Sequence, residues 1–268
     1  MDINIKDIGI FIKFVEKQYI SPTLDGRLFF SASTYFKSKE AYYKDKTMGD
    51  VYDPYESTDR YVMRADEIFI KAYGDKKIHK IPVKKIPISF RTVKPYGICS
   101  FMYLNFLDFE EDKDINTDKQ KYAQKLINYS DKIKFYKLKS KVIEQLRSFQ
   151  KIEEKNKKQK CVPLIFANNE FVNMMNNPKN QMGHGLVEYH DLNKEVEMNE
   201  IPDYSKKEDV EVLFKKDISY VGQREFRLIR RIHEGIKGEE FSVPELKGHI
   251  SKSSIEDISM LRLILGYH

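Results

Sequence analysis

The chain is divided by one stretch that lacks both residues that most often break helices. Thr117–Lys160 contains no Gly and no Pro, whereas the sequence on both sides consists of short apolar runs separated by turn residues. Two helical faces can be read inside this stretch, Tyr122/Leu126/Tyr129 and Leu138/Val142/Leu146/Phe149. We therefore expect helices in this middle segment and strands before and after it.

The runs outside the middle segment predict a β-rich body. Strands that cluster instead of alternating with helices argue against a doubly wound α/β fold, so the expected class is α+β with a mostly antiparallel sheet. Gly97–Leu107 is the most apolar run and is expected to be a central strand. The other expected strands are Ile8–Glu16, Arg27–Ser31, Tyr61–Arg64, Glu67–Tyr73, Ile81–Phe90, Cys161–Phe166, Leu186–Tyr189 and Arg224–Ile232.

This pattern gives a division into three parts. Residues 1–114 and 161–268 are expected to be two parts of the same body, and 115–160 a helical, basic insertion that forms an arm. The whole chain has 268 residues, a net charge of +6 and 41% hydrophobic residues, which is enough apolar material for a core. We expect no membrane span, because no apolar run approaches the roughly 18 residues that one requires.

Positive charge is concentrated in the middle segment. Lys119–Lys160 holds 14 Lys and Arg against 4 Asp and Glu, so the remainder of the chain is net acidic. Such a segment can bind a phosphate backbone or an acidic protein surface, and its binding candidates are Lys137, Lys139, Lys141 and Arg147. The alternative is a solvated helical hairpin whose lysines only face water.

A second candidate site lies in Phe214–Ile232, FKKDISYVGQREFRLIRRI. Glu225 stands inside the predicted strand, which β propensity does not favour. Glu225 and Arg227 share a face and could form a salt-linked strand that fixes its register. The arginines, Arg224, Arg227, Arg230 and Arg231, form a candidate anion-binding cluster, because guanidinium groups match phosphate and carboxylate geometry.

Several familiar chemistries are missing from the sequence. There is no Gly-rich phosphate loop, no GxSxG, no HExxH and no CxxC. Cys99 and Cys161 are too few for a zinc site or a disulfide framework and are expected to be buried free thiols in a reducing cytoplasm. The six histidines show no metal spacing, so no metal is expected. His184 and His190 bracket a predicted strand, where either a shared site or two ordinary polar residues is conceivable.

Scattered motifs resemble a loosely defined group of uncharacterised proteins of phages, prophages and bacteria. The pieces are Asp25–Ser31 with Tyr35-Phe36, an acidic pair Asp53 and Glu56, Gly185–Tyr189, and the Y-x-x-Q-x-E-F-R block that ends at Arg227. These short pieces are scattered over most of the chain outside the basic segment. The resemblance implies no settled activity, but it implies that the basic segment is inserted into a common body.

Gln223-Arg224-Glu225 is also similar to the third motif of ADP-ribosyltransferases. That resemblance implies that Glu225 stabilises the cationic sugar formed when NAD loses nicotinamide, that Gln223 selects the acceptor, and that Arg27 holds the phosphates. The Ser-x-Ser motif of the family comes on a later strand, whereas Ser31-Ala32-Ser33 follows Arg27 directly. If Glu225 has this role, Arg27 and Glu225 should line one cleft on adjacent strands, within about the 10 Å reach of a bound dinucleotide. Positions on opposite faces of the sheet would exclude the enzyme.

Two functions are therefore expected. The first is a cytoplasmic phage or mobile-element protein that binds a host protein complex or nucleic acid, as a host-takeover or anti-defence inhibitor, without a cofactor. An aromatic-rich body with an extended arm is also expected to form homo-oligomers. The alternative is an NAD-consuming, ADP-ribosyltransferase-like enzyme that uses Glu225. Whether the chain is an enzyme is left open by the sequence.

Overall fold

The computed structural model describes residues 9–33, 58–64, 67–70, 77–82, 85–91, 94–114, 132–157, 159–201 and 210–267. The helix expected around Tyr122–Tyr129 and most of the acidic segment that holds Asp53 and Glu56 lie outside these residues.

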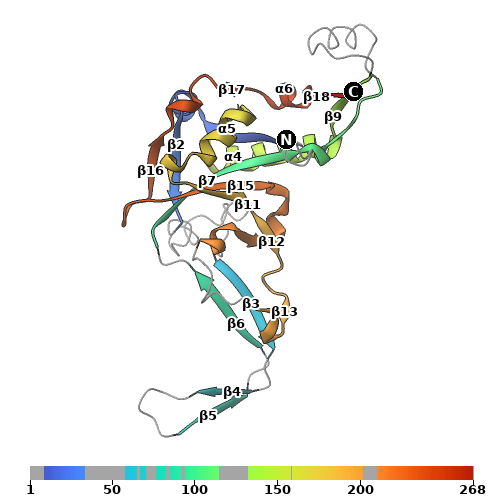
Figure 1. The fold of residues 1–268 in the computed structure, drawn as a ribbon. Coiled ribbons are helices and arrows are strands. Elements are labelled where there is room, and N and C mark those ends of the chain that lie inside the picture. The colour runs from blue at the N-terminus through green and yellow to red at the C-terminus, as the bar shows by residue number, and fades with distance from the viewer. Residues whose placement is uncertain are drawn as a thin grey trace.

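A large antiparallel sheet organises the molecule (Figure 1). Its long central strand β7 pairs with a neighbour from each end of the chain. The strands of this sheet that precede the middle segment, β7 and β1, lie between two pairs of strands that follow it. The strand order is β11 (Gly183–Leu186), β15 (Glu225–Arg231), β7 (Tyr96–Asn105), β1 (Gly9–Glu16), β10 (Cys161–Phe166) and β17 (Ile250–Lys252). The expected α+β class with a mostly antiparallel sheet is confirmed.

A branch leaves this sheet at β7. Strand β2 (Arg27–Ala32) pairs antiparallel with the first part of β7, and β16 (Gly238–Ser242) pairs antiparallel with β2. Strands β1 and β2 are joined by a short 3-10 turn, η2 (Lys17–Tyr19), and a one-turn helix, α1 (Ile20–Leu24). The chain therefore leaves the sheet after β1 and returns to the same central strand at a different point.

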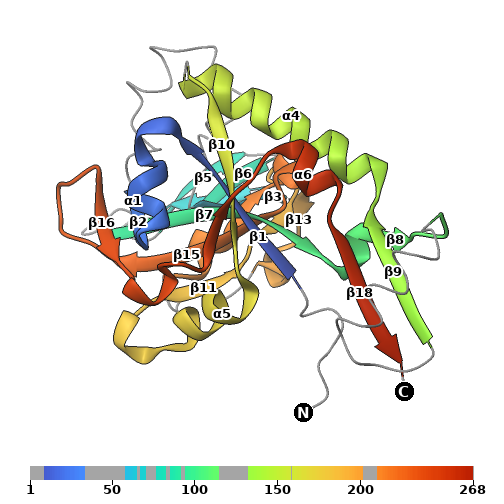
Figure 2. The same cartoon turned by 90° about the horizontal axis from the view of Figure 1, so that it is seen from above.

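The two faces of the sheet bury separate cores. One core contains Phe11, Phe101 and Phe226 and is covered by α5 (Asn168–Asn176) through Phe171 and Met174. On the opposite face, Ile12 and Phe14 pack against α4 (Ser140–Lys157) and α6 (Ile255–Ser259). In Figure 2, α4 and α5 lie on opposite sides of β1 and β10. Alternation along each strand sends successive side chains to these two cores.

Helix α4 is part of the second core. The apolar spacing read from the sequence places Val142 and Leu146 inward, and both are buried there. Within the described part of the basic segment, Lys132–Leu138 forms strand β9, so the expectation of a helix is wrong over these residues. Its sequence KIKFYKL alternates, which suits a strand.

Smaller sheets complete the structure. Strand β9 lies between β8 (Phe109–Glu111) and β18 (Arg262–Tyr267), and β3 (Thr58–Arg64) lies between β13 (Glu195–Val196) and β6 (Lys85–Arg91). Strands β12 (Glu188–His190) and β14 (Lys215–Asp217) pair in parallel. The single strand expected over Ile81–Phe90 is two strands: β6, and β5 (His79–Pro82), which pairs with β4 (Glu67–Ile70). Figure 1 shows β4 and β5 at the end farthest from the main sheet.

Candidate functional site

The main sheet splits at the middle of β7. On one edge β15 follows β7 from Met102 to Tyr96. On the other edge, β1 pairs with β7 from Met102 onward, and β2 pairs with Gly97 and Ile98. Within the described strands, Cys99–Phe101 has a partner strand on one side only, which leaves a fork between β1 and β2.

A lysine closes the fork at its base. The Nζ of Lys13 donates a hydrogen bond of 3.0 Å to the backbone carbonyl of Ser100 and lies 5.0 Å from the centre of the Phe101 ring. A buried carbonyl without a partner is costly. The lysine therefore replaces the neighbouring strand that the fork removes.

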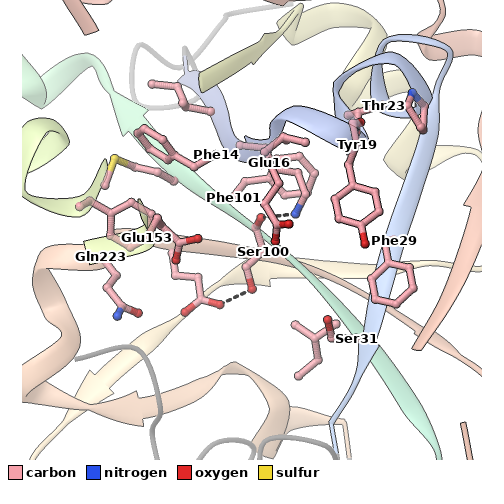
Figure 3. A pocket seen from close by; sticks show the side chains of 18 of the residues that line it. Phe14, Glu16, Tyr19, Thr23, Phe29, Ser31, Ser100, Phe101, Glu153 and Gln223 are labelled. Atoms are coloured by element: carbon pink, nitrogen blue, oxygen red, sulfur yellow. Dashed lines mark hydrogen bonds between the residues drawn. The ribbon is translucent and has the colours of Figure 1, made fainter. Parts of the chain in front are cut away.

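A cavity of about 460 Å³ occupies the fork. The connection between β1 and β2 contributes Tyr19, Pro22 and Thr23, and α4 contributes Phe149 and Glu153. Figure 3 shows Glu16, Tyr19, Phe29, Ser100 and Gln223 around the same space. A cavity of this size falls within the range of small-molecule sites.

Residues from three strands reach the cavity from one face of the sheet. On β2, the side chains of Arg27, Phe29 and Ser31 point away from the buried Leu28 and Phe30 and line the cavity. Ser100 of β7 and Glu225 of β15 line it as well. Arg27 and Glu225 thus line one cavity, as expected for the enzyme. The expectation that they stand on adjacent strands is wrong, because β7 lies between β2 and β15.

Glu225 lies at the bottom of the cavity in a buried ion network. Its Oε1 accepts from Nε of Arg227 at 2.8 Å and its Oε2 accepts from Nη2 of the same residue at 3.2 Å. The Nζ of Lys216 donates to Oε2 of Glu225 at 3.1 Å and to Oε1 of Gln223 at 2.8 Å. The Oγ of Ser100 donates to Oε1 of Glu225 at 2.5 Å. Each donor fixes the carboxylate in one orientation.

The network keeps Glu225 charged. Burial alone would raise the pKa of this carboxyl, but the charges of Arg227 and Lys216, together with hydrogen bonds from Arg227 and Ser100, hold the pKa well below its usual range. The backbone N–H of Glu225 donates to the Tyr189 hydroxyl at 2.9 Å. Burial, followed by the nearby negative charge of Glu225, raises the pKa of Tyr189 to about 12.

The four arginines of the predicted anion-binding cluster have four different environments. Arg227 is 1% exposed, and its Nη1 donates to the Leu213 carbonyl. The remaining three are Arg224, which forms an ion pair with Asp108, Arg230, whose guanidinium lies 3.6 Å from the centre of the Phe241 ring, and the exposed Arg231. The four arginines are close in sequence, but the described structure does not bring them together around one partner.

The basic candidates of the middle segment lie on β9, on α4 and at the junction between them. Lys137 is within 3.6 Å of Asp112 and of Asp114. Lys139 donates to the Leu107 carbonyl at 2.8 Å. Lys141 and Arg147 are exposed on α4.

The two histidines do not share a site. His184 is in β11, where its ring lies 6.2 Å from the ring of Phe226 and burial lowers its pKa. His190 is in β12 of a different sheet, with Nε2 2.8 Å from Oδ1 of the buried Asp59 and its ring stacked on Tyr61. The strand expected between them is interrupted at Val187, which separates β11 from β12.

Sequence reasoning missed three residues of the site. Lys13 and Ser100 stand inside apolar strands, and this polarity is the only sign of them in the sequence. Lys216 stands beside Lys215 in the stretch Phe214–Ile232, and nothing in the sequence distinguishes the two lysines. The roles of these three residues in the site arise from contacts with side chains or backbone groups of other strands, which the sequence does not show.

Among the described residues, no group of three or more His, Cys, Asp and Glu side chains is arranged to hold a metal ion. No helix in the described part of the chain is both long and apolar enough to cross a membrane. Comparisons with protein-family models, curated proteins and solved structures found no match.

Proposed function

We propose that the chain is an NAD-consuming transferase of the ADP-ribosyltransferase type, with the forked-sheet cavity as its active site. The observation that carries this proposal is the position of Arg27 and Glu225, which line one cavity from the same face of the sheet. They come from β2 and β15, the strands on the two sides of β7.

The proposed chemistry is the cleavage of the bond between nicotinamide and ribose. The electron pair of that C–N bond goes to the ring nitrogen, and the sugar carbon becomes cationic. Glu225 stabilises this cation, because Lys216, Arg227 and Ser100 hold it as a fixed carboxylate. The acceptor then forms a new bond to the sugar carbon and loses its proton.

Three further residues have roles in this proposal. Arg27 is half-exposed at the rim, where it pairs with Glu240 at 3.4 Å and would exchange this carboxylate for the phosphates of NAD. Gln223 lies beside Glu225 at the cavity and contacts the acceptor. Ser100 supplies the serine on a later strand that Ser31 and Ser33 do not.

The experiment is a measurement of nicotinamide release from NAD, by chromatography, with and without added protein acceptors. We expect release by the wild type, and a fall in kcat/KM of about tenfold or more for Arg27→Ala. This variant should unfold like the wild type, because the Arg27–Glu240 pair is exposed. Arg147→Ala, an exposed arginine outside the cavity, is the matched control. No release by the wild type, or full activity of Arg27→Ala, would reject the proposal.

A second function, the binding of a host macromolecule by a cytoplasmic phage or mobile-element protein, is favoured by exposed basic residues. Lys139, just before α4, and Lys141 and Arg147 on α4 are all exposed. Both cysteines are buried free thiols, which suits a reducing compartment. The partner would be nucleic acid or an acidic protein complex.

The test of this second function is binding to a random DNA duplex over a range of salt concentrations. We expect affinity to fall as salt rises and the triple variant Lys139→Glu, Lys141→Glu, Arg147→Glu to reduce the salt slope by about three charges. Salt-independent binding would contradict the nucleic-acid partner. Light scattering of the same samples tests the proposed homo-oligomer, which a monomeric mass would reject.

A further inference from the structure

A two-stranded ribbon projects from the smaller sheets. Strands β4 and β5 pair antiparallel from Glu67↔Pro82 to Ile70↔His79, and they form a sheet of their own. Figure 1 shows this ribbon beyond β3 and β6, at the end of the molecule farthest from the main sheet. A hairpin of two strands is at best marginally stable in water. A partner that covers the ribbon would therefore stabilise it.

The part of the sequence that contains the ribbon is basic. Residues 58–91 hold nine Lys and Arg against four Asp and Glu, a net charge of +5. Outside this segment and Lys119–Lys160, the chain is net acidic. The basic residues are thus concentrated in two regions, and Figure 1 shows the ribbon far from helix α4 of the other region.

Exposed side chains lie at the start of β5. Lys77, Ile78, His79 and Lys80 are all exposed, and Ile78 is 63% exposed. The two lysines place positive charge along the ribbon, beside an isoleucine that is largely in water. A nucleic-acid groove offers contacts for both, because phosphates line its rims and thymine methyl groups lie inside the major groove.

We infer that the β4–β5 ribbon binds in the major groove of double-stranded DNA. That groove is about 12 Å wide and admits a two-stranded ribbon, whose strands lie about 4.8 Å apart. Lys77 and Lys80 contact phosphates, and Ile78 contacts base edges. The major groove of duplex RNA is deep and narrow, so side chains do not read it, and DNA is the duplex that fits.

This inference goes beyond the transferase and adds a second contact to the nucleic-acid binding proposed for α4. It names duplex DNA as the nucleic acid and the ribbon as the element that enters it. It rests on that second proposed function in one respect, since both require the chain to bind DNA. The two contacts use different residues, so variants can separate them.

The experiment measures binding to a short random DNA duplex by fluorescence anisotropy over a range of salt concentrations. We expect Lys77→Glu with Lys80→Glu to weaken binding at least about tenfold at about 50 mM salt. Lys77→Gln with Lys80→Gln, which removes the charges without reversing them, should lower the slope of log affinity against log salt by about two. The matched control is Lys179→Glu with Lys252→Glu, two exposed lysines outside both basic regions, which should bind like the wild type. Melting curves check that each variant is folded.

Two small molecules of known groove preference test the position of the ribbon. Methyl green binds the major groove of DNA, and netropsin binds the minor groove. We expect methyl green, and not netropsin, to displace the protein from the duplex. Three further probes, a DNA single strand, duplex RNA of the same sequence and polyglutamate, should each bind more weakly than duplex DNA.

The outcomes separate this inference from the function proposed for α4. Displacement by netropsin, or binding of any of the three further probes as tightly as duplex DNA, overturns the inference. Wild-type affinity in both ribbon variants also overturns it, even if the α4 triple variant loses binding. Loss of binding in the ribbon variants alone supports the inference and rejects the role of α4. If the wild type does not bind duplex DNA, both are rejected, while nicotinamide release still tests the transferase separately.

Discussion

The hydroxyl of Ser100 donates a 2.5 Å hydrogen bond to the carboxylate of Glu225 from 125 residues away in sequence. This bond joins β7 to β15 at the cavity, on the face that also holds Lys216 and Arg227. It makes Ser100 a positioning residue for the carboxylate.

Replacing Ser100 with Ala should remove one of the hydrogen bonds that hold the Glu225 carboxylate in place. We expect a loss of about 1–3 kcal/mol in the free energy of unfolding, because the bond is made to a charged group. Nicotinamide release should fall by a larger factor than NAD affinity. Urea denaturation measures the unfolding free energy, and steady-state kinetics measures nicotinamide release. The control is Ser148→Ala, which alters an exposed serine of α4. An unchanged kcat would remove the positioning role.

Replacing Glu225 with Gln should destabilise the protein strongly. Glu225 is 7% exposed and Arg227 1% exposed, so the substitution leaves buried positive charge without its carboxylate. Breaking such a pair costs about 3–5 kcal/mol. Thermal and urea denaturation measure it. The exposed Glu234→Gln should stay within about 0.5 kcal/mol of the wild type. A melting temperature that Glu225→Gln leaves unchanged would show that the network does not stabilise the fold.

The contribution of Glu225 should depend on pH in the acid range. Its pKa is lowered in the folded protein from the ordinary value of 4.5, so the unfolded state takes up the proton first. The stabilising contribution is complete above that value and is lost as the pH falls through the folded pKa. The difference in unfolding free energy between wild type and Glu225→Gln should therefore be constant from neutral pH downward and shrink below about pH 4.5. A difference that is constant to the lowest pH measured would contradict this.

Tyr189 should titrate later than the other tyrosines of the protein. Its folded pKa of about 12, against 10.0 for an ordinary tyrosine, favours the protonated phenol in the fold. Stability from this residue is complete below the unfolded pKa and is lost as the pH rises between the two values. Tyrosinate absorbance of the wild type minus that of Tyr189→Phe should isolate this late step. A midpoint near pH 10 in the titration of this absorbance difference would be inconsistent with burial of Tyr189 beside Glu225.

Gly26 should not tolerate alanine. Its φ is +82°, and a Cβ there would lie 2.3 Å from the backbone carbonyl oxygen of Val243. Gly235 has a φ of +76° but nothing within 4 Å of its Cβ position, so Gly235→Ala isolates the backbone strain. We expect about 1 kcal/mol for Gly235→Ala and at least about 2 kcal/mol more for Gly26→Ala. Equal losses in urea denaturation would show that the contact with Val243 relaxes.

Much of the architecture follows from local patterns. The apolar run at Gly97–Leu107 predicted a central strand and the run at Cys161–Phe166 predicted a strand, and β7 and β10 confirm them. Helix α6 begins with a capping box, in which Ser254 and Asp257 exchange side-chain to backbone hydrogen bonds. These features depend on residues that are close together in the chain, so local sequence patterns are enough to predict them.

The site was only partly predictable. Alternation placed Glu225 and Arg227 on one face, and their direct ion pair agrees with that expectation. The fork could not be predicted, because it depends on the registers in which β1 and β2 pair with β7. Lys13 and Ser100 gain their roles only from that register. The four arginines do not form one cluster, because Arg224 pairs with Asp108 and Arg230 packs on the ring of Phe241.

The pairing of β7 with β15 also sets a limit on folding during synthesis. Strands β1, β2 and β7 leave the ribosome early, but β10 and β15, which cover β1 and the second edge of β7, follow only after residue 160. Until then the apolar central strand has an unpaired edge, which invites association with other chains. A nascent chain stalled before Glu225 should therefore depend on chaperones, since it carries most of the apolar strands but lacks the one that completes the cavity.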